Sequence, residues 1–171
     1  MNMNDLNLHE IDLFVFDFDG VLTNNTVCID QNGIESVLCS RADGLAFDVL
    51  RKLKKPVYIL STEKNAVVSS RAEKLNIPTL QGIKNKEEAL RGLVDGLGFK
   101  LTNIVYIGND LNDYNAMRIC GYTACPADSH ERIKNIATFI LKTSGGMGVA
   151  RELLEDILNL DILKILYGEL E

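Results

Sequence analysis

The sequence predicts an α/β fold with a mostly parallel sheet flanked by helices. Short apolar runs, such as residues 11–16 and 103–107, alternate with longer segments whose apolar residues recur at helical spacing. Acidic, amide and hydroxyl residues gather directly after several of these runs, where open α/β sheets bind their ligands. The length of 171 residues suits one domain with a sizeable core, and we expect a single domain over 1–171.

The elements can be assigned in chain order from local patterns. An apolar run typical of a buried parallel strand places the first strand at about 11–16. Residues 26–39 break the alternation, because Val27 and Ile29 alternate with polar neighbours and Gln31-Asn32-Gly33 makes a turn; this predicts a β-hairpin inserted at 24–40. The remaining helices are expected at about 43–54, 63–75, 85–97, 111–119 and 148–167, and the remaining strands at 57–60, 77–80, 103–107, 122–124 and 138–141, the last two as short edge strands.

The composition excludes several classes of function. A hydrophobic content of 46%, a charged content of 25% and a net charge of -6 are typical of a globular protein and argue against a nucleic-acid partner or a membrane-surface role. The longest apolar stretches are too short to span a bilayer, and the polar residues 1–10 do not read as a signal peptide. The four cysteines form no CxxC pair, so we expect reduced thiols in a cytoplasmic protein.

Two aspartates follow the first strand and give the most informative motif of the chain. Asp17 and Asp19 are two residues apart, so strand geometry points both side chains the same way. Like charges that close repel, and the pair calls for a bound cation or a shared proton. With Gly20 and Thr23 behind them, they fit a phosphoryl-transfer site with one nucleophilic and one acid/base carboxylate. The plain alternative is two aspartates in a polar loop.

Further polar residues follow the second and later strands. Ser61 and Thr62 could donate hydrogen bonds to phosphoryl oxygens, although both residue types also cap helices. Lys86 opposes the dipole at a helix start and could offset phosphate and carboxylate charge, although the neighbouring Lys84 keeps a solvated surface lysine as the alternative.

The segment from Gly108 to Asp113 gives the strongest second signal. Asp110 is expected to complete an all-oxygen Mg²⁺ site with Asp17 and the main-chain carbonyl of Asp19. Asp113 could orient Lys86 or a water, or could be an ordinary acid at a helix N-terminus.

Together these pieces resemble the haloacid dehalogenase superfamily of aspartyl phosphatases over nearly the whole chain: DFDGVLT from Asp17, then Ser61, Lys86 and the GNDLND segment. The resemblance implies a Rossmann-like sheet in which Asp17 attacks phosphorus and forms an aspartyl-phosphate. Asp19 would protonate the leaving alcohol and then activate water. Mg²⁺, Ser61 and Lys86 would balance the charge on the transferring group.

Many members of the superfamily carry a cap domain, but this chain leaves no room for one. About 19 residues separate Thr23 from Asp43, and they are used by the hairpin. The chain therefore resembles the capless branch typified by 3-deoxy-manno-octulosonate 8-phosphate phosphatase. The segment Arg41-x-Asp43-Gly44 and the glycine-rich residues 144–148 agree with this resemblance. That resemblance implies a homotetramer with active sites near subunit interfaces.

One departure bears on the substrate. Glu63 and Lys64 follow Ser61-Thr62, a pattern more similar to that of nine-carbon keto-deoxy sugar acid 9-phosphate phosphatases. Glu63 could accept hydrogen bonds from sugar hydroxyls, and Lys64 or Arg41 could pair with a sugar carboxylate, although Glu63 and Lys64 could also be a solvated helix start. The residues expected to bind the substrate are Thr23, Arg41, Thr62, Glu63, Lys64 and Asp113.

The leading hypothesis is a Mg²⁺-dependent phosphatase of a nine-carbon 2-keto-3-deoxy sugar acid phosphate. An eight-carbon octulosonate 8-phosphate is the alternative substrate. A non-catalytic oligomerisation module, related to those fused to sialate cytidylyltransferases, is the alternative from another class. The intact Asp17, Asp19, Lys86 and Asp110 argue against it, because a scaffold has no need of a close carboxylate pair.

Overall fold

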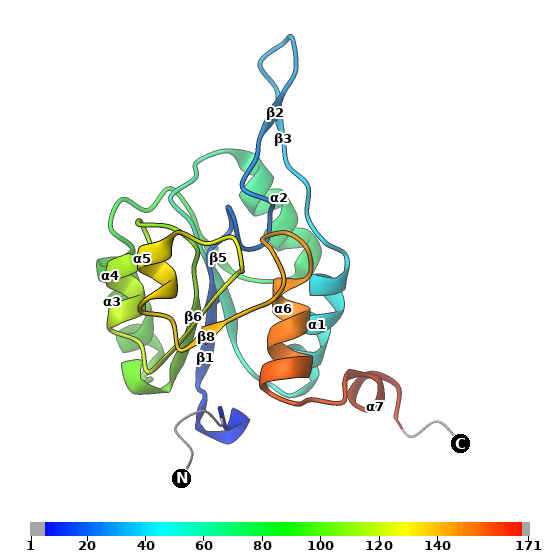
Figure 1. Cartoon of the computed structure of the whole chain (residues 1–171), viewed down its shortest axis with the longest axis vertical. Coiled ribbons are helices and arrows are strands. Elements are labelled where there is room, and N and C mark those ends of the chain that lie inside the picture. The colour runs from blue at the N-terminus through cyan, green and yellow to red at the C-terminus, as the bar shows by residue number, and fades with distance from the viewer. Residues whose placement is uncertain (1–5, 169–171) are drawn as a thin grey trace.

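The computed structural model describes residues 6–168 and confirms the α/β fold. Six parallel strands form one sheet in the order β5-β4-β1-β6-β7-β8, with helices on both faces (Figure 1). The strands of the sheet are β1 (Leu13–Phe16), β4 (Val57–Leu60), β5 (Thr79–Leu80), β6 (Ile104–Ile107), β7 (Tyr122–Cys125) and β8 (Phe139–Ile140).

Helices cover both faces of the sheet, and the central strand β1 divides its side chains between them. Phe14 and Phe16 pack on the side of α1 and α6, whereas Leu13 and Val15 pack on the side of α3 and α4. This alternation follows from the period of two along a strand. The helices are α1 (Ala42–Lys52), α2 (Ala66–Leu75), α3 (Lys86–Leu97), α4 (Tyr114–Arg118), α5 (Glu131–Lys134), α6 (Val149–Glu152), the π-helical turn η3 (Leu153–Ile157) and α7 (Ile162–Tyr167), with 3-10 turns η1 (Leu8–Glu10) and η2 (Leu101–Asn103).

The expected hairpin is present and stands clear of the body of the molecule (Figure 1). Its strands β2 (Cys28–Ile29) and β3 (Glu35–Ser36) pair antiparallel, and Gly33 has the positive φ of 77° that the turn requires. Between Thr23 and α1 the described chain holds only this hairpin, and between β4 and α3 only α2 and β5. No cap domain is inserted at either place.

Several expectations about elements are wrong, among them the helix expected at 111–119, which begins only at Tyr114. β7 lies between β6 and β8 and is not an edge strand. The helix expected at 148–167 is interrupted, because Asn159 takes a positive φ of 50° and the Asp161 side chain accepts the Lys164 N–H, which starts α7 anew. The helix expected from 63 begins at Ala66, because the Asn65 side chain caps it by accepting the Val67 N–H at 3.1 Å.

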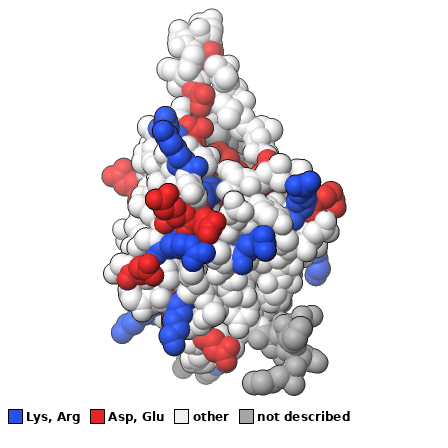
Figure 2. All heavy atoms as spheres, turned by 90° about the vertical axis from the view of Figure 1, so that its left-hand side faces the viewer, with Lys and Arg blue, Asp and Glu red and all other residues white. Residues whose placement is uncertain are grey.

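Charged side chains of both signs are interspersed on the face that α3 and α4 cover, while the hairpin above it carries few charges (Figure 2). Four large apolar side chains of the hairpin segment are at least half exposed: Val27, Ile29, Ile34 and Leu38. Within residues 6–168, no helix is long and apolar enough to cross a membrane.

Candidate active site

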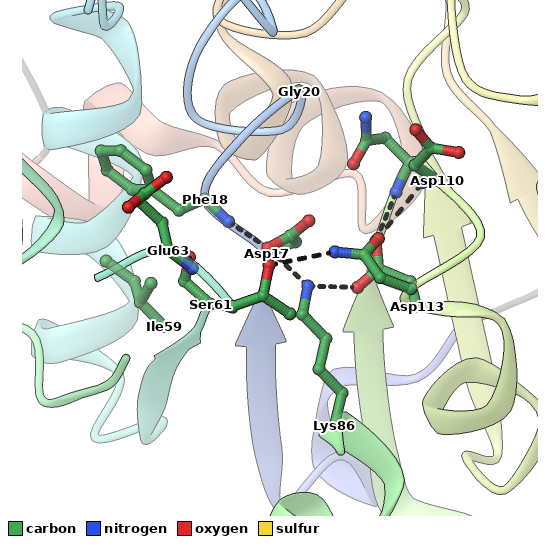
Figure 3. A network of polar contacts seen from close by, with 12 residues as sticks. Asp17, Phe18, Gly20, Ile59, Ser61, Glu63, Lys86, Asp110 and Asp113 are labelled. Carbon is green, nitrogen blue, oxygen red and sulfur yellow. Dashed lines mark hydrogen bonds and ion pairs between the residues drawn. The ribbon is translucent and has the colours of Figure 1, made fainter. Parts of the chain in front are cut away.

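The site lies where the three central strands end. β1 leads into Asp17, β4 into Ser61 and β6 into Gly108 and Asn109, so parallel pairing brings these residues to one edge of the sheet (Figure 3). The ends are fixed by the sheet's own hydrogen bonds, since Asp17 N–H donates to the Ile107 carbonyl at 2.8 Å. The structure therefore brings together Asp17, Ser61 and the Gly108–Asn109 segment, which the sequence places at separate strand ends.

Asp17 is a buried carboxylate with a cation beside it. Its side chain is 3% exposed, and Oδ1 lies 2.6 Å from Lys86 Nζ and accepts the Phe18 N–H at 2.7 Å. Burial, followed by repulsion from the Asp113 carboxylate, raises the pKa of Asp17 well above its ordinary value, against the opposing effect of Lys86. The negative charge gathered here is therefore only partly compensated by the protein.

Lys86 extends from the start of α3 toward Asp17 and Asp113 (Figure 3). Its Nζ lies 2.7 Å from Asp113 Oδ1, and its side chain is 1% exposed. Burial alone would lower the pKa of Lys86, but the Asp17 and Asp113 carboxylates outweigh it and raise the pKa. The alternative of a solvated surface lysine is wrong.

Asp113 is the second carboxylate that pairs with this lysine. Oδ1 accepts the Tyr106 hydroxyl at 2.8 Å as well as Lys86, and Oδ2 accepts the Asn109 N–H at 2.9 Å. Asp113 has no exposed side-chain surface, and it makes no capping hydrogen bond to α4. The structure thus places it as a residue that orients Lys86, away from any surface that a substrate could reach.

Asp19 and its loop form the second part of the site. Burial and then the Glu63 carboxylate raise the pKa of Asp19, with a further contribution from Glu35 and opposition from Lys86. Thr23 is fully buried, and its Oγ1 accepts the Gly20 N–H at 3.2 Å. Thr23 therefore shapes the loop that carries Asp19 rather than facing a substrate.

The segment after β4 lies beside Asp19. The Ser61 hydroxyl oxygen accepts the Glu63 N–H at 3.1 Å, which leaves its hydrogen able to point toward a phosphoryl group. Glu63 Oε1 accepts the main-chain N–H groups of Lys64 and Asn65 at 2.6 and 2.7 Å. Thr62 and Lys64 are exposed, so their side chains are accessible to a substrate.

Arg41 lies apart from this group. It is exposed at the start of α1 and lines a groove of about 470 Å³ between α1 and α2, together with Arg71 and Lys74. The structure therefore places Arg41 in this groove and not among the residues gathered at the strand ends of the same chain.

Asp110 and Asn109 differ from the expectation for the metal site. Asp110 is exposed, its Oδ1 accepts the neighbouring Leu111 N–H at 2.7 Å, and its charge is not among those that shift the pKa of Asp17 or Asp19. Asn109 is 6% exposed, and its Oδ1 is buried without a hydrogen-bond partner within the described residues. A Cβ added at Gly20 would lie 1.9 Å from Asn109 Nδ2, so Asn109 packs directly on the Asp19 loop.

Sequence reasoning missed Asn109, and the signal that could have found it is its place directly after Gly108 at the end of β6. A buried acceptor oxygen without a donor needs an explanation, and a hydrated cation supplies one. Residues 6–168 hold no cluster of three or more His, Cys, Asp or Glu side chains suited to a metal. Mg²⁺ nevertheless needs only one or two carboxylates beside neutral oxygens and water, which Asp17, the Asp19 carbonyl and Asn109 can provide.

The model of a protein family described as haloacid dehalogenase-like hydrolase matches residues 47–153. The chain is 30% identical over 162 residues to the 3-deoxy-D-manno-octulosonate 8-phosphate phosphatase of Escherichia coli K12. The aligned region covers 94% of this chain and 83% of the relative.

Two solved structures extend the likeness to three dimensions. A HAD family hydrolase of Streptomyces avermitilis has a TM-score of 0.89 at 37% identity, covering 92% of this chain and 91% of that one. The 3-deoxy-D-manno-octulosonate 8-phosphate phosphatase of Moraxella catarrhalis, solved with a magnesium ion, a phosphate ion and KDO, has a TM-score of 0.82 at 32% identity, covering 91% and 87%.

Proposed function

Because the chain belongs to the haloacid dehalogenase-like hydrolases and is a phosphoric monoester hydrolase, we propose that it hydrolyses the phosphate monoester of a 2-keto-3-deoxy sugar acid. The observation that supports this most directly is the buried Asp17–Lys86–Asp113 network at the edge of the sheet. A nucleophilic carboxylate must be ionised and aimed, and Lys86 at 2.6 Å holds Asp17 in place and opposes the burial and the Asp113 charge that raise its pKa.

In the proposed reaction, a carboxylate oxygen of Asp17 attacks phosphorus, and the bond from phosphorus to the leaving oxygen breaks. Asp19 gives its proton to that oxygen, so the sugar leaves as a neutral alcohol and the phosphoryl group stays on Asp17. Asp19 then takes a proton from water, whose oxygen attacks phosphorus and releases phosphate and free Asp17. The raised pKa of Asp19 suits it to hold a proton for the first step.

Ser61 and Lys86 act on the charge of the transferring group. The Ser61 hydroxyl can donate to a phosphoryl oxygen, and Lys86, paired with Asp17, offsets the negative charge of the carboxylate and the phosphoryl group. Mg²⁺ would be held by Asp17, the Asp19 carbonyl and an oxygen from the loop after β6. Asp110 was expected to supply this oxygen, and the buried, unpartnered Oδ1 of Asn109 supports Asn109 instead. When bound, it would supply further positive charge against the phosphoryl oxygens.

For the sugar we favour a nine-carbon acid carried as its 9-phosphate. Glu63 uses Oε1 for two main-chain N–H groups, so Oε2 can accept from sugar hydroxyls beside Asp19, while the exposed Thr62 and Lys64 flank the same entrance. Lys64 can pair with the sugar carboxylate. Arg41 could do so only from a neighbouring subunit, given its place in the α1–α2 groove.

The second candidate substrate is 3-deoxy-D-manno-octulosonate 8-phosphate, and it is favoured by the relatives from Escherichia coli and Moraxella catarrhalis, whose names carry that activity. The non-catalytic module is the alternative from another class that the sequence alone left open. It gives no reason for a lysine to be buried between two carboxylates, which is costly unless the site needs that charge.

We further propose a cytoplasmic homotetramer in which neighbouring subunits complete the open site. The support is the absence of a cap at either insertion point in the described chain, together with the exposed Val27, Ile29, Ile34 and Leu38 of the hairpin segment. A monomer that keeps full activity on dilution would contradict this assembly.

The function is tested by measuring phosphate release from the nine-carbon and eight-carbon substrates, with and without Mg²⁺. We expect release from at least one, a preference for the nine-carbon acid, and none from Asp17→Asn, which should stay folded by circular dichroism. Turnover by Asp17→Asn would contradict the nucleophile assignment. No release from either substrate by the folded wild-type protein would favour the module.

A further inference from the structure

The glycine-rich turn Ser144–Gly148 packs against the loop that carries Asp19. A Cβ added at Gly145 would lie 2.2 Å from the Gly20 carbonyl oxygen and 2.9 Å from that of Thr23. Contacts under 3.0 Å to backbone cannot be relieved by moving a flexible side chain, so Gly145 fits only as glycine. The two backbones therefore lie in direct contact.

The contact is also hydrogen-bonded. Gly146 N–H donates to the Val21 carbonyl at 2.9 Å, and Gly146 takes a positive φ of 71° to reach it. Asn109 also contacts this loop, since its Nδ2 lies 1.9 Å from the position of a Gly20 Cβ. The Asp19 loop thus contacts both the turn and the end of β6, and Gly20 has no side chain that would separate it from Asn109.

Carboxylates from three separate parts of the chain fix the turn in place. Asp128, after β7, accepts the Gly145 N–H at 2.9 Å. Glu152 in α6 accepts the N–H groups of Lys142 and Thr143, each at 2.8 Å, and Asp43 in α1 accepts the Ala150 N–H at 2.9 Å. Both ends and the middle of residues 142–150 are therefore anchored to the body of the protein, which makes the turn a rigid support and not a flexible linker.

On the premise that Asp19 is the acid/base group proposed above, we propose that the turn Ser144–Gly148 positions Asp19 for proton transfer, with Gly145 and Asp128 as the positioning residues. A proton must pass over a hydrogen-bond distance. A side chain at Gly145, for which there is no room, or the loss of the Asp128 hydrogen bond would shift the loop and move the Asp19 carboxyl group away from the leaving oxygen. Neither residue touches the phosphoryl group. Their effect should therefore be largest on the step that needs a proton.

Leaving-group dependence separates this role from general destabilisation. An alkyl alcohol leaves poorly without a proton, whereas p-nitrophenolate leaves well without one. The experiment measures release of the leaving group in a single turnover, with enzyme in excess and Mg²⁺ saturating, from 3-deoxy-D-manno-octulosonate 8-phosphate and from p-nitrophenyl phosphate. The variants are Gly145→Ala, Asp128→Ala and Asp128→Asn, whose amide oxygen can still accept the Gly145 N–H.

We expect Gly145→Ala and Asp128→Ala to slow release of the sugar by about tenfold more than release of p-nitrophenolate, with Asp128→Asn closer to wild type. Gly96→Ala is the matched control, since Gly96 lies exposed in α3 with no atom near its Cβ position. Equal losses on both substrates, or no loss, would overturn the inference. Failure of the wild-type protein to hydrolyse either substrate would instead count against the proposed function. Because Asp128 is exposed, its variants are expected to fold, and they test the inference if Gly145→Ala does not fold.

Discussion

Lys86 Nζ and Asp113 Oδ1 lie 2.7 Å apart in an ion pair that is closed to solvent, with side chains 1% and 0% exposed. The pair is not isolated, because Tyr106 donates its hydroxyl to the same Asp113 oxygen. Removing one partner of a buried ion pair leaves the other charge uncompensated, which is more costly than losing an exposed pair.

Asp113→Ala is therefore expected to destabilise the fold by about 3 kcal/mol or more and to lower kcat, because it strands Lys86 and the Tyr106 hydroxyl. Asp113→Asn keeps an acceptor oxygen and should cost less stability while still lowering kcat. Urea unfolding and steady-state kinetics measure both quantities. Glu131→Gln, in an exposed pair with Lys134, is the control and should change the free energy of unfolding and kcat only slightly. Changes in Asp113→Ala as small as those in the control would contradict the positioning role.

The loop after β6 offers two candidates for the third oxygen ligand of the metal. We expect Asn109→Ala to weaken Mg²⁺ binding by about tenfold or more and Asp110→Ala to weaken it less, because the Asn109 oxygen is buried and unpartnered while Asp110 turns to its own loop. Isothermal titration calorimetry with Mg²⁺ checks the order, and Asn115→Ala is the matched control on the exposed side of α4. The reverse order would restore the assignment made from the sequence.

Glu63 is expected to select the sugar. Glu63→Gln should change the ratio of kcat/KM between the nine-carbon and eight-carbon substrates by about tenfold, because a charged acceptor binds hydroxyl groups more strongly than an amide. Steady-state kinetics on both substrates gives this ratio, and Glu87→Gln in α3 serves as the control. A uniform loss on all substrates would argue that Glu63 acts on the chemistry through its charge beside Asp19.

Asp43 should make stability depend on pH. Burial raises its pKa from an ordinary value of 3.8 to about 6, although it accepts main-chain N–H groups at the start of α6. The folded state therefore holds a proton that the unfolded state has released, so this contribution to stability is present below about pH 4 and lost as pH rises through about 6. The loss amounts to about 3 kcal/mol.

Asp43→Asn cannot ionise, so the free energy of unfolding of the variant should rise relative to wild type by about that amount between pH 4 and pH 8. Chemical denaturation across this range measures the difference. The exposed Glu73→Gln should leave the wild-type dependence unchanged. A constant difference between wild type and Asp43→Asn would show that folding does not raise the pKa of Asp43.

The sequence predicted the sheet and the grouping of the candidate site residues because both depend on local patterns. Asp17, Ser61 and Lys86 stand at the ends of apolar strands or at a helix start, and parallel strands must bring such ends together. The interruption near Asn159 was not predictable in this way, because the apolar residues on both sides keep a helical spacing. A left-handed asparagine leaves little trace in that pattern.

The positions of Asn109 and Arg41 depend on tertiary contacts. The acidic residue beside Asn109 is the more obvious ligand type, and only the folded chain shows that Asn109 is buried against Gly20 while Asp110 is exposed. Arg41 is near Asp43 in sequence, but in the folded chain it lines the groove between α1 and α2 with Arg71 and Lys74. Spacing along the chain cannot distinguish these outcomes.

The main chain at the three strand ends has a consequence for hydrogen exchange. The amide of Asp17 donates to Ile107 and that of Gly108 to Ala124, so each extends a ladder between buried strands, whereas the amide of Ser61 donates to Leu80 in the half-buried edge strand β5. The amides of Asp17 and Gly108 can meet solvent only when the centre of the sheet opens, and we expect them to exchange at the rate of global unfolding and that of Ser61 to exchange faster. Fluctuations that admit or release a substrate must then come from the segments around this edge, while the nucleophile itself stays fixed.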